Sequence, residues 1–178
     1  VIKDFVYDDG AYSTDNNEVN GYRYYPTQQQ ATITVIEQNF DERLIDVEIT
    51  SADMADGSTV SKNVTINGKT MDVAAVKDYV SDPDNGAWSR EGDKNTLVIE
   101  FVQDGLFDIA VNGKDLADNE AAEKTDKIAM DSQAPDFDIS YNEEENGIVT
   151  KMLRAITFGI YNKDNNGTLT FTVSDDAT

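Results

Sequence analysis

The stretch that decides the fold spans residues 96–111 and reads TLVIEFVQDGLFDIAV. Large apolar residues occupy every second position on either side of a polar turn. They are Leu97, Ile99, Phe101, Phe107, Ile109 and Val111. Alternation with a period of two is typical of strands that bury one face. The stretch therefore predicts two strands, 96–101 and 106–111, joined as a hairpin by Gln103-Asp104-Gly105.

The same alternation recurs on both sides of this stretch. It predicts strands at 30–38, 45–51 and 127–130. The aromatic segment 21–26 ends on a proline, which suits an edge strand or the entrance to a strand. β-Branched and aromatic residues favour a pleated, half-buried surface. The chain is therefore predicted to be all-β, and its core is expected to include Ile33, Val35, Val47 and Ile49 besides the six residues above.

Residues 52–93 break this rhythm. Asn67-Gly68 predicts a tight hairpin turn within 64–71. Apolar residues three and four apart then predict a short helix over 72–80, capped by Asp72 and ended by Asp82-Pro83. We interpret 52–93 as a small insertion containing a short helix.

The alternation restarts after Ser132-Gln133-Ala134-Pro135, with predicted strands at 137–141 and 168–173. We therefore expect a first domain over 1–132. Residues 133–178 are expected to be a linker and the N-terminal part of a second, incomplete module. The chain begins with valine rather than methionine, so we expect it to be a piece of a longer protein.

Charge and missing residue types exclude several functions. The net charge is −21, which repels nucleic acid and anionic membrane surfaces. Without Cys or His, zinc sites built on those ligands and His- or Cys-based catalysis are excluded. No apolar run approaches the length needed for membrane insertion. Neighbouring acids such as Asp8-Asp9 lie in loops rather than across a cleft, so we expect no enzyme.

Several short motifs, taken in order, resemble a known family. They are Tyr24-Tyr25 with residues 31–35 and Asn39-Phe40-Asp41, then Asp104-Gly105 with Phe107-Asp108-Ile109, then Asp115-Leu116-Ala117-Asp118-Asn119, and finally residues 128–131 with Ala134-Pro135. Over roughly residues 20–135 the chain is similar to the bacterial Ig-like repeats of Gram-positive surface proteins, with Asp118 where Gly is usual.

The resemblance implies an immunoglobulin-like β-sandwich, followed by the start of a second Ig-like module. It implies a non-catalytic stalk or adhesin module, extracellular and associated with the cell surface or cell wall. Its partners would be neighbouring Ig-like modules of the same chain and a host or cell-wall glycan or protein. The alternative is a carbohydrate-binding module accessory to a secreted glycosidase.

Two acidic loops are candidate calcium sites, although no cofactor is required by the sequence. Their oxygen-bearing residues are Asp82, Asp84 and Asn85 in one loop and Asn162, Asp164 and Asn166 in the other. The second loop has EF-hand-like spacing, but its twelfth position is Val173 inside a predicted strand. The same residue types also form tight turns without a metal.

Trp88, Tyr22 and Tyr24 are candidates for a sugar-stacking platform. The alternative places Trp88, the only tryptophan, in the core or as an anchor of the 52–93 segment. An exposed Trp88 beside either tyrosine would favour the carbohydrate-binding function.

Overall fold

The computed structural model describes residues 1–7, 18–142 and 168–174. They fall into two compact units, one within residues 1–132 and the other within 133–176. Nearly all regular structure among the described residues is strand, as the sequence predicts, and their only α-helix is short. No helix in these described ranges is long and apolar enough to cross a membrane.

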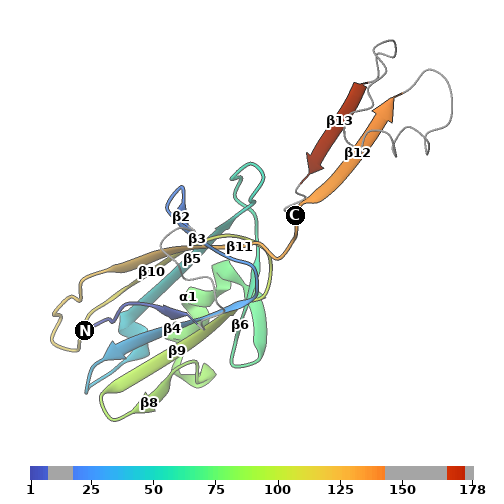
Figure 1. Ribbon diagram of the computed structural model, residues 1–178. Coiled ribbons are helices and arrows are strands. Elements are labelled where there is room, and N and C mark those ends of the chain that lie inside the picture. The colour runs from blue at the N-terminus through green and yellow to red at the C-terminus, as the bar shows by residue number, and fades with distance from the viewer. Residues whose placement is uncertain (8–17, 143–167, 175–178) are drawn as a thin grey trace. The chain divides into compact units, whose positions relative to one another are not determined.

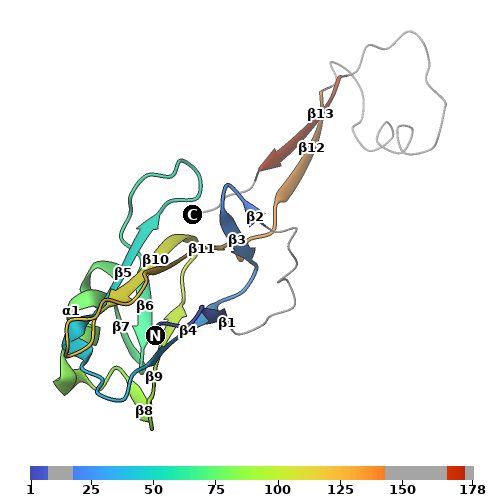
Figure 2. The same cartoon turned by 90° about the vertical axis from the view of Figure 1, so that its left-hand side faces the viewer.

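The first unit contains two β-sheets (Figures 1 and 2). The first sheet has the order β1-β4-β9-β6-β7, and a short strand β8 also pairs with β9. Its strands are β1 (Val6–Tyr7), β4 (Gln29–Ile36), β6 (Asn63–Ile66), β7 (Lys69–Asp72), β8 (Ser89–Glu91) and β9 (Lys94–Phe101). All of these pairs are antiparallel.

The second sheet has the order β2-β3-β11-β10-β5. Its strands are β2 (Glu18–Val19), β3 (Tyr22–Tyr25), β5 (Ile45–Ala52), β10 (Gly105–Gly113) and β11 (Lys124–Met130). Here β3 runs parallel to β11, whereas the other pairs are antiparallel. Among the described strands of the first unit, the one parallel pair therefore joins strands from near its two ends.

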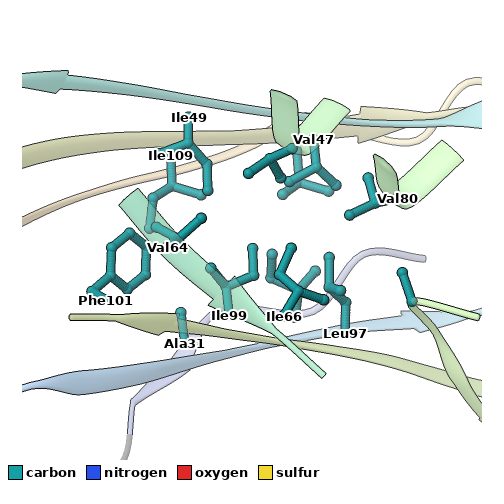
Figure 3. Close-up of a cluster of buried hydrophobic side chains, with 14 of the residues drawn as sticks. Ala31, Val47, Ile49, Val64, Ile66, Val80, Leu97, Ile99, Phe101 and Ile109 are labelled. Carbon is teal, nitrogen blue, oxygen red and sulfur yellow. The ribbon is translucent and has the colours of Figure 1, made fainter. Parts of the chain in front are cut away.

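The two sheets bury a common core between them (Figure 3). The strict alternation of buried and partly exposed residues in β4, β9 and β10 produces this core. Phe101 of β9 and Phe107 of β10 meet edge to face with ring centroids 4.9 Å apart, and both are fully buried. All ten residues predicted for the core are buried.

The predicted 96–111 hairpin is wrong in one respect. Both strands form, but β9 pairs with β4, β6 and β8, whereas β10 pairs with β5 and β11. The chain crosses from one sheet to the other at residues 102–104, and Gly105 follows with a φ of 152°. The two strands therefore face each other across the core instead of lying side by side.

Part of the 52–93 segment belongs to the first sheet and is not an insertion. Val64 of β6 pairs with Phe101, and both Val64 and Ile66 are fully buried. The β6–β7 hairpin turns at Asn67-Gly68 as predicted. The predicted helix is a 3₁₀ turn, Val73–Ala75, followed by α1 (Val76–Ser81), and the Asp72 side chain accepts from the Ala74 amide at its start.

The described part of the second unit is a two-stranded antiparallel sheet. It consists of β12 (Asp136–Asn142) and β13 (Thr168–Ser174), which lie where strands were predicted. Phe137 pairs with Val173, and the two side chains are 67% and 59% exposed. A two-stranded sheet is only marginally stable by itself in water.

The first and last residues of the first unit lie at opposite ends of its strands. The backbone of Val1 bonds with that of Ile36, the last residue of β4. At the other end Ser132 donates to Asp104 through its amide and hydroxyl groups, at 3.2 and 2.8 Å. An eight-residue strand rises about 3.3 Å per residue, so roughly 25 Å of strand separates these ends.

Candidate functional site

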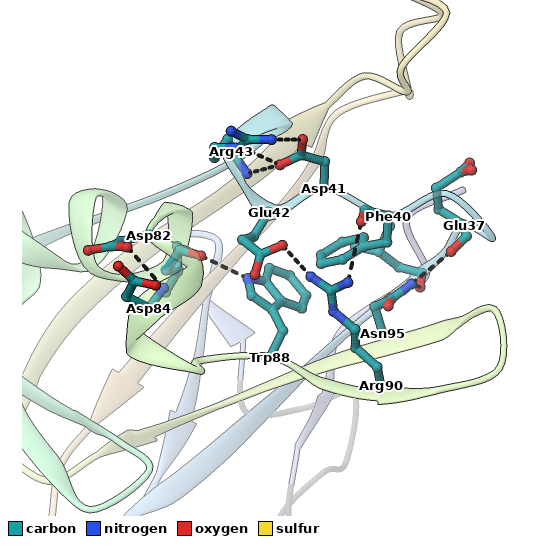
Figure 4. A network of polar contacts seen from close by, with 12 residues as sticks. Glu37, Phe40, Asp41, Glu42, Arg43, Asp82, Asp84, Trp88, Arg90 and Asn95 are labelled. Carbon is teal, nitrogen blue, oxygen red and sulfur yellow. Dashed lines mark hydrogen bonds and ion pairs between the residues drawn. The ribbon is translucent and has the colours of Figure 1, made fainter.

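Trp88 is part of the core and does not offer a stacking face. Its side chain is 8% exposed and meets the Phe40 ring edge to face, 5.0 Å between centroids. Its indole Nε1 donates to the Val80 carbonyl at 3.0 Å, which fastens α1 to the sheet (Figure 4). Trp88 is therefore not part of a sugar-stacking platform. It anchors the 52–93 segment, as in the alternative interpretation.

Tyr22 and Tyr24 lie on β3 of the second sheet and remain partly exposed. The Lys127 ammonium lies over the Tyr22 ring, 5.0 Å from its centroid, and its Nζ also donates to Asp108 at 2.6 Å. Partial burial and the nearby Asp108 carboxylate raise the pKa of Tyr22. One face of this ring is already occupied by a cation, so the tyrosines do not form an open platform with Trp88.

The candidate calcium residues at 82–85 have structural partners. Asp82 caps a 3₁₀ turn, Pro83–Asn85, by accepting from the Asp84 amide, and Asn85 donates to the Tyr79 carbonyl at 3.0 Å. Within the described ranges no three acidic side chains gather in a way that could hold a metal ion. These residues therefore form a turn. Asn162, Asp164 and Asn166 lie outside the described residues.

Salt is expected to stabilise the protein, because screening weakens repulsion within a chain of net charge −21. The melting temperature should rise from low to moderate NaCl, and CaCl₂ at equal ionic strength should add nothing through residues 82–85. A site with ligand at 100 times its Kd would add about 2.7 kcal/mol. A calcium-specific shift that Asp84→Ser removes would contradict this expectation.

A polar network surrounds Trp88 at the N-terminal end of the unit (Figure 4). Arg90 pairs with the buried Glu42, and its guanidinium lies 5.1 Å from the centroid of the Phe40 ring. Asn95, 1% exposed, directs its amide nitrogen at the carbonyls of residues 35, 37 and 93, at 3.0–3.2 Å. These contacts hold the β4–β5 connection and the β8–β9 turn together.

A second network, which sequence patterns did not indicate, joins the N-terminal strands to β11. Arg23 contacts both carboxylate oxygens of Asp126, at 2.6 and 2.8 Å, and the Tyr7 hydroxyl donates to Asp126 at 2.9 Å. Burial, followed by the Asp126 charge, raises the pKa of Tyr7. The partners are more than 100 residues apart in sequence, and no local pattern signals such a pairing.

Asp118, in the loop between β10 and β11, has an uncommon backbone conformation. This residue has a φ of 66°, a left-handed conformation that glycine adopts without strain and that Asp tolerates. Asp115 fixes the loop by accepting from the amides of Ala117 and Asn119 and from the Asn119 side chain, at 2.8–2.9 Å.

Asp118→Gly is expected to change the free energy of unfolding by no more than about 0.5 kcal/mol, because Gly suits this backbone. Asp118→Val should cost about 1–2 kcal/mol, because a β-branched side chain is strained at positive φ. Urea unfolding of both variants measures the difference. Equal stability of the two would contradict the left-handed conformation at residue 118.

Asp115 is expected to contribute to an acid unfolding transition. Hydrogen bonds, first from the Asn119 side chain and then from backbone amides, lower its pKa below the ordinary value of 3.8. The folded state therefore binds fewer protons than the unfolded state, and this stabilisation is lost as the pH falls below 3.8. Asp115→Asn should flatten the stability–pH curve there, and an unchanged slope would contradict this role.

Two cavities adjoin the same β10–β11 loop, with volumes of about 660 and 530 Å³. They share Ile45, Gly113, Lys114, Glu120 and Ala121 as lining residues. Lys77 in the larger cavity pairs with Asp46 and Glu48, so this cation is already neutralised. Ser81, also in this cavity, directs its hydroxyl at the Asp78 carbonyl rather than at a base.

No protein-family model matches the chain, and no curated protein matches its sequence significantly.

Proposed function

We propose that residues 1–132 form an immunoglobulin-like module. In such modules one sheet has the strand order A-B-E-D and the other contains C, F and G. Strands A to G are assigned in chain order to β1, β4, β5, β6, β9, β10 and β11. The first sheet then contains β1-β4-β9-β6, which is A-B-E-D. The second sheet contains β5, β10 and β11, which are C, F and G. The crossing between β9 and β10 is then the E–F connection, which supports the assignment.

The proposed role is a non-catalytic spacer in a multidomain bacterial surface protein, extracellular and associated with the cell wall. The observation that carries this role is the separation of Val1 and Ser132 to opposite ends of the strands. Modules with this geometry add their lengths when they are joined in series. The acidic surface, which resists self-association, and the resemblance to Gram-positive surface repeats support the same role.

The parallel β3–β11 pair suits a spacer that carries tension. Force applied through the two ends of the unit pulls parallel strands in opposite directions along their axes. The hydrogen bonds that pair residues 23–25 with 128–130 are then loaded together rather than one after another. The Arg23–Asp126 ion pair bridges the same two strands.

Single-molecule force spectroscopy tests this role. The chain has no cysteine, so Val1→Cys and Ser132→Cys provide two unique attachment points. We expect a single unfolding event that releases roughly 450 Å of contour length, at about 3.6 Å per residue. Arg23→Met should lower the unfolding force. Gradual extension at low force, without a discrete event, would contradict a spacer that carries tension.

A further inference from the structure

Four Asn-Gly pairs lie within the described residues, and their asparagine side chains differ in how they are held. The pairs begin at Asn20, Asn67, Asn85 and Asn112. An asparagine followed by glycine can lose its side-chain amide when the next backbone nitrogen attacks the side-chain carbonyl carbon. Glycine favours this attack because no side chain shields its nitrogen.

In three of the four pairs, hydrogen bonds or strand pairing restrain the groups that would react. The Asn67 amide donates to the carbonyls of Gly86 and Ala87, at 2.9 and 3.4 Å, and that of Asn85 donates to Tyr79. Asn112 and Gly113 are paired with β5 in extended conformation. Gly113 is packed so closely that an added Cβ would lie 2.7 Å from a methyl carbon of Ile45.

Asn20 has none of these restraints. It is exposed, and its side chain makes no hydrogen bond to any residue that the structure describes. Asn20 and Gly21 form the turn between β2 and β3 with φ values of 55° and 83°. β2 has only two residues, so few backbone contacts resist opening of this turn.

We propose that Asn20 is a site of spontaneous deamidation and isoaspartate formation in the folded protein. The Gly21 nitrogen forms a bond to the Asn20 side-chain carbonyl carbon, and ammonia leaves to give a cyclic succinimide. Water then opens the ring to aspartate or to isoaspartate, so no other reactant is required. The isoaspartate product adds a backbone methylene to the turn, which we expect to unpair β2 from β3.

The test is peptide mapping by mass spectrometry after incubation of the full chain in mildly alkaline buffer containing ¹⁸O-water. The Asn20 peptide should gain label before the peptides that contain Asn67, Asn85 and Asn112. The Asn67 peptide should react about tenfold more slowly, because its amide must first break hydrogen bonds to carbonyl groups. Asn20→Gln should abolish the change at this position, and protein unfolded in urea should lose the difference between the two peptides.

Hydrogen exchange provides a second measurement. Residues 18–25 of the aged protein should exchange faster than in fresh protein, whereas the Asn20→Gln variant should show no change on ageing. Equal label in the folded protein at Asn20 and Asn67, or none at Asn20, would overturn the proposal.

Discussion

Phe107→Ala is expected to lower the free energy of unfolding by about 3–5 kcal/mol, the usual cost of truncating a buried aromatic residue. Phe107 is fully buried and meets Phe101 of the opposite sheet edge to face. Its removal leaves a cavity between the sheets and eliminates a contact that joins them. Leu106→Ala is the matched control, because Leu106 lies on the other face of β10 and is only partly buried.

Urea unfolding monitored by Trp88 fluorescence measures both variants. The Leu106 variant should lose far less stability than the Phe107 variant. A loss within about 0.5 kcal/mol for Phe107→Ala, which is typical of surface positions, would show that the register of β10 is wrong.

Asn95→Asp is expected to cost about 3–5 kcal/mol at neutral pH, the range for leaving a buried charge without a partner. The substitution keeps the shape of the side chain but replaces a donor with an acceptor. Three carbonyl oxygens, at 3.0–3.2 Å, would then face a carboxylate and lose their hydrogen bonds. Asn39→Asp is the control, because it adds the same charge at an exposed position of the neighbouring connection.

The cost of Asn95→Asp should also depend on pH. Burial and the facing carbonyls raise the pKa of the new carboxyl in the folded state above its unfolded value. The folded state therefore binds more protons than the unfolded state, and the variant becomes less stable as the pH rises. Urea titrations between mildly acidic and neutral pH should show the deficit growing. A deficit like that of Asn39→Asp at every pH would contradict the hydrogen bonds assigned to Asn95.

The sequence predicted which faces of the strands are buried but not which strands are neighbours. Alternation in 96–111 predicts that Leu97 and Ile109 are buried, and both predictions are confirmed. The same alternation is compatible with a hairpin and with a crossing between sheets, because a short polar turn can serve either. Pairing depends on contacts with β4, β5 and β11, which lie far away in sequence.

Candidate site residues were harder to predict, because their types serve both structural and binding functions. Asp82 and Asn85 have the oxygen atoms that calcium requires. In the folded chain, however, the Asp82 carboxylate accepts from the Asp84 amide, and the Asn85 side-chain nitrogen donates to the Tyr79 carbonyl. Burial of Trp88 depends on α1 and Phe40, which pack around it only in the folded chain. The Arg23–Asp126 pair likewise becomes visible only when β3 and β11 lie side by side.

The strand order is central to the proposed module, since it carries both the immunoglobulin-like assignment and the separation of the two ends. Nuclear Overhauser contacts between backbone protons of residues 1–132 test it most directly. We predict cross-strand contacts between Thr32 and Val98 in the first sheet and between Thr50 and Asp108 in the second. Backbone contacts that pair residues 96–101 with 106–111 as a hairpin would contradict the account.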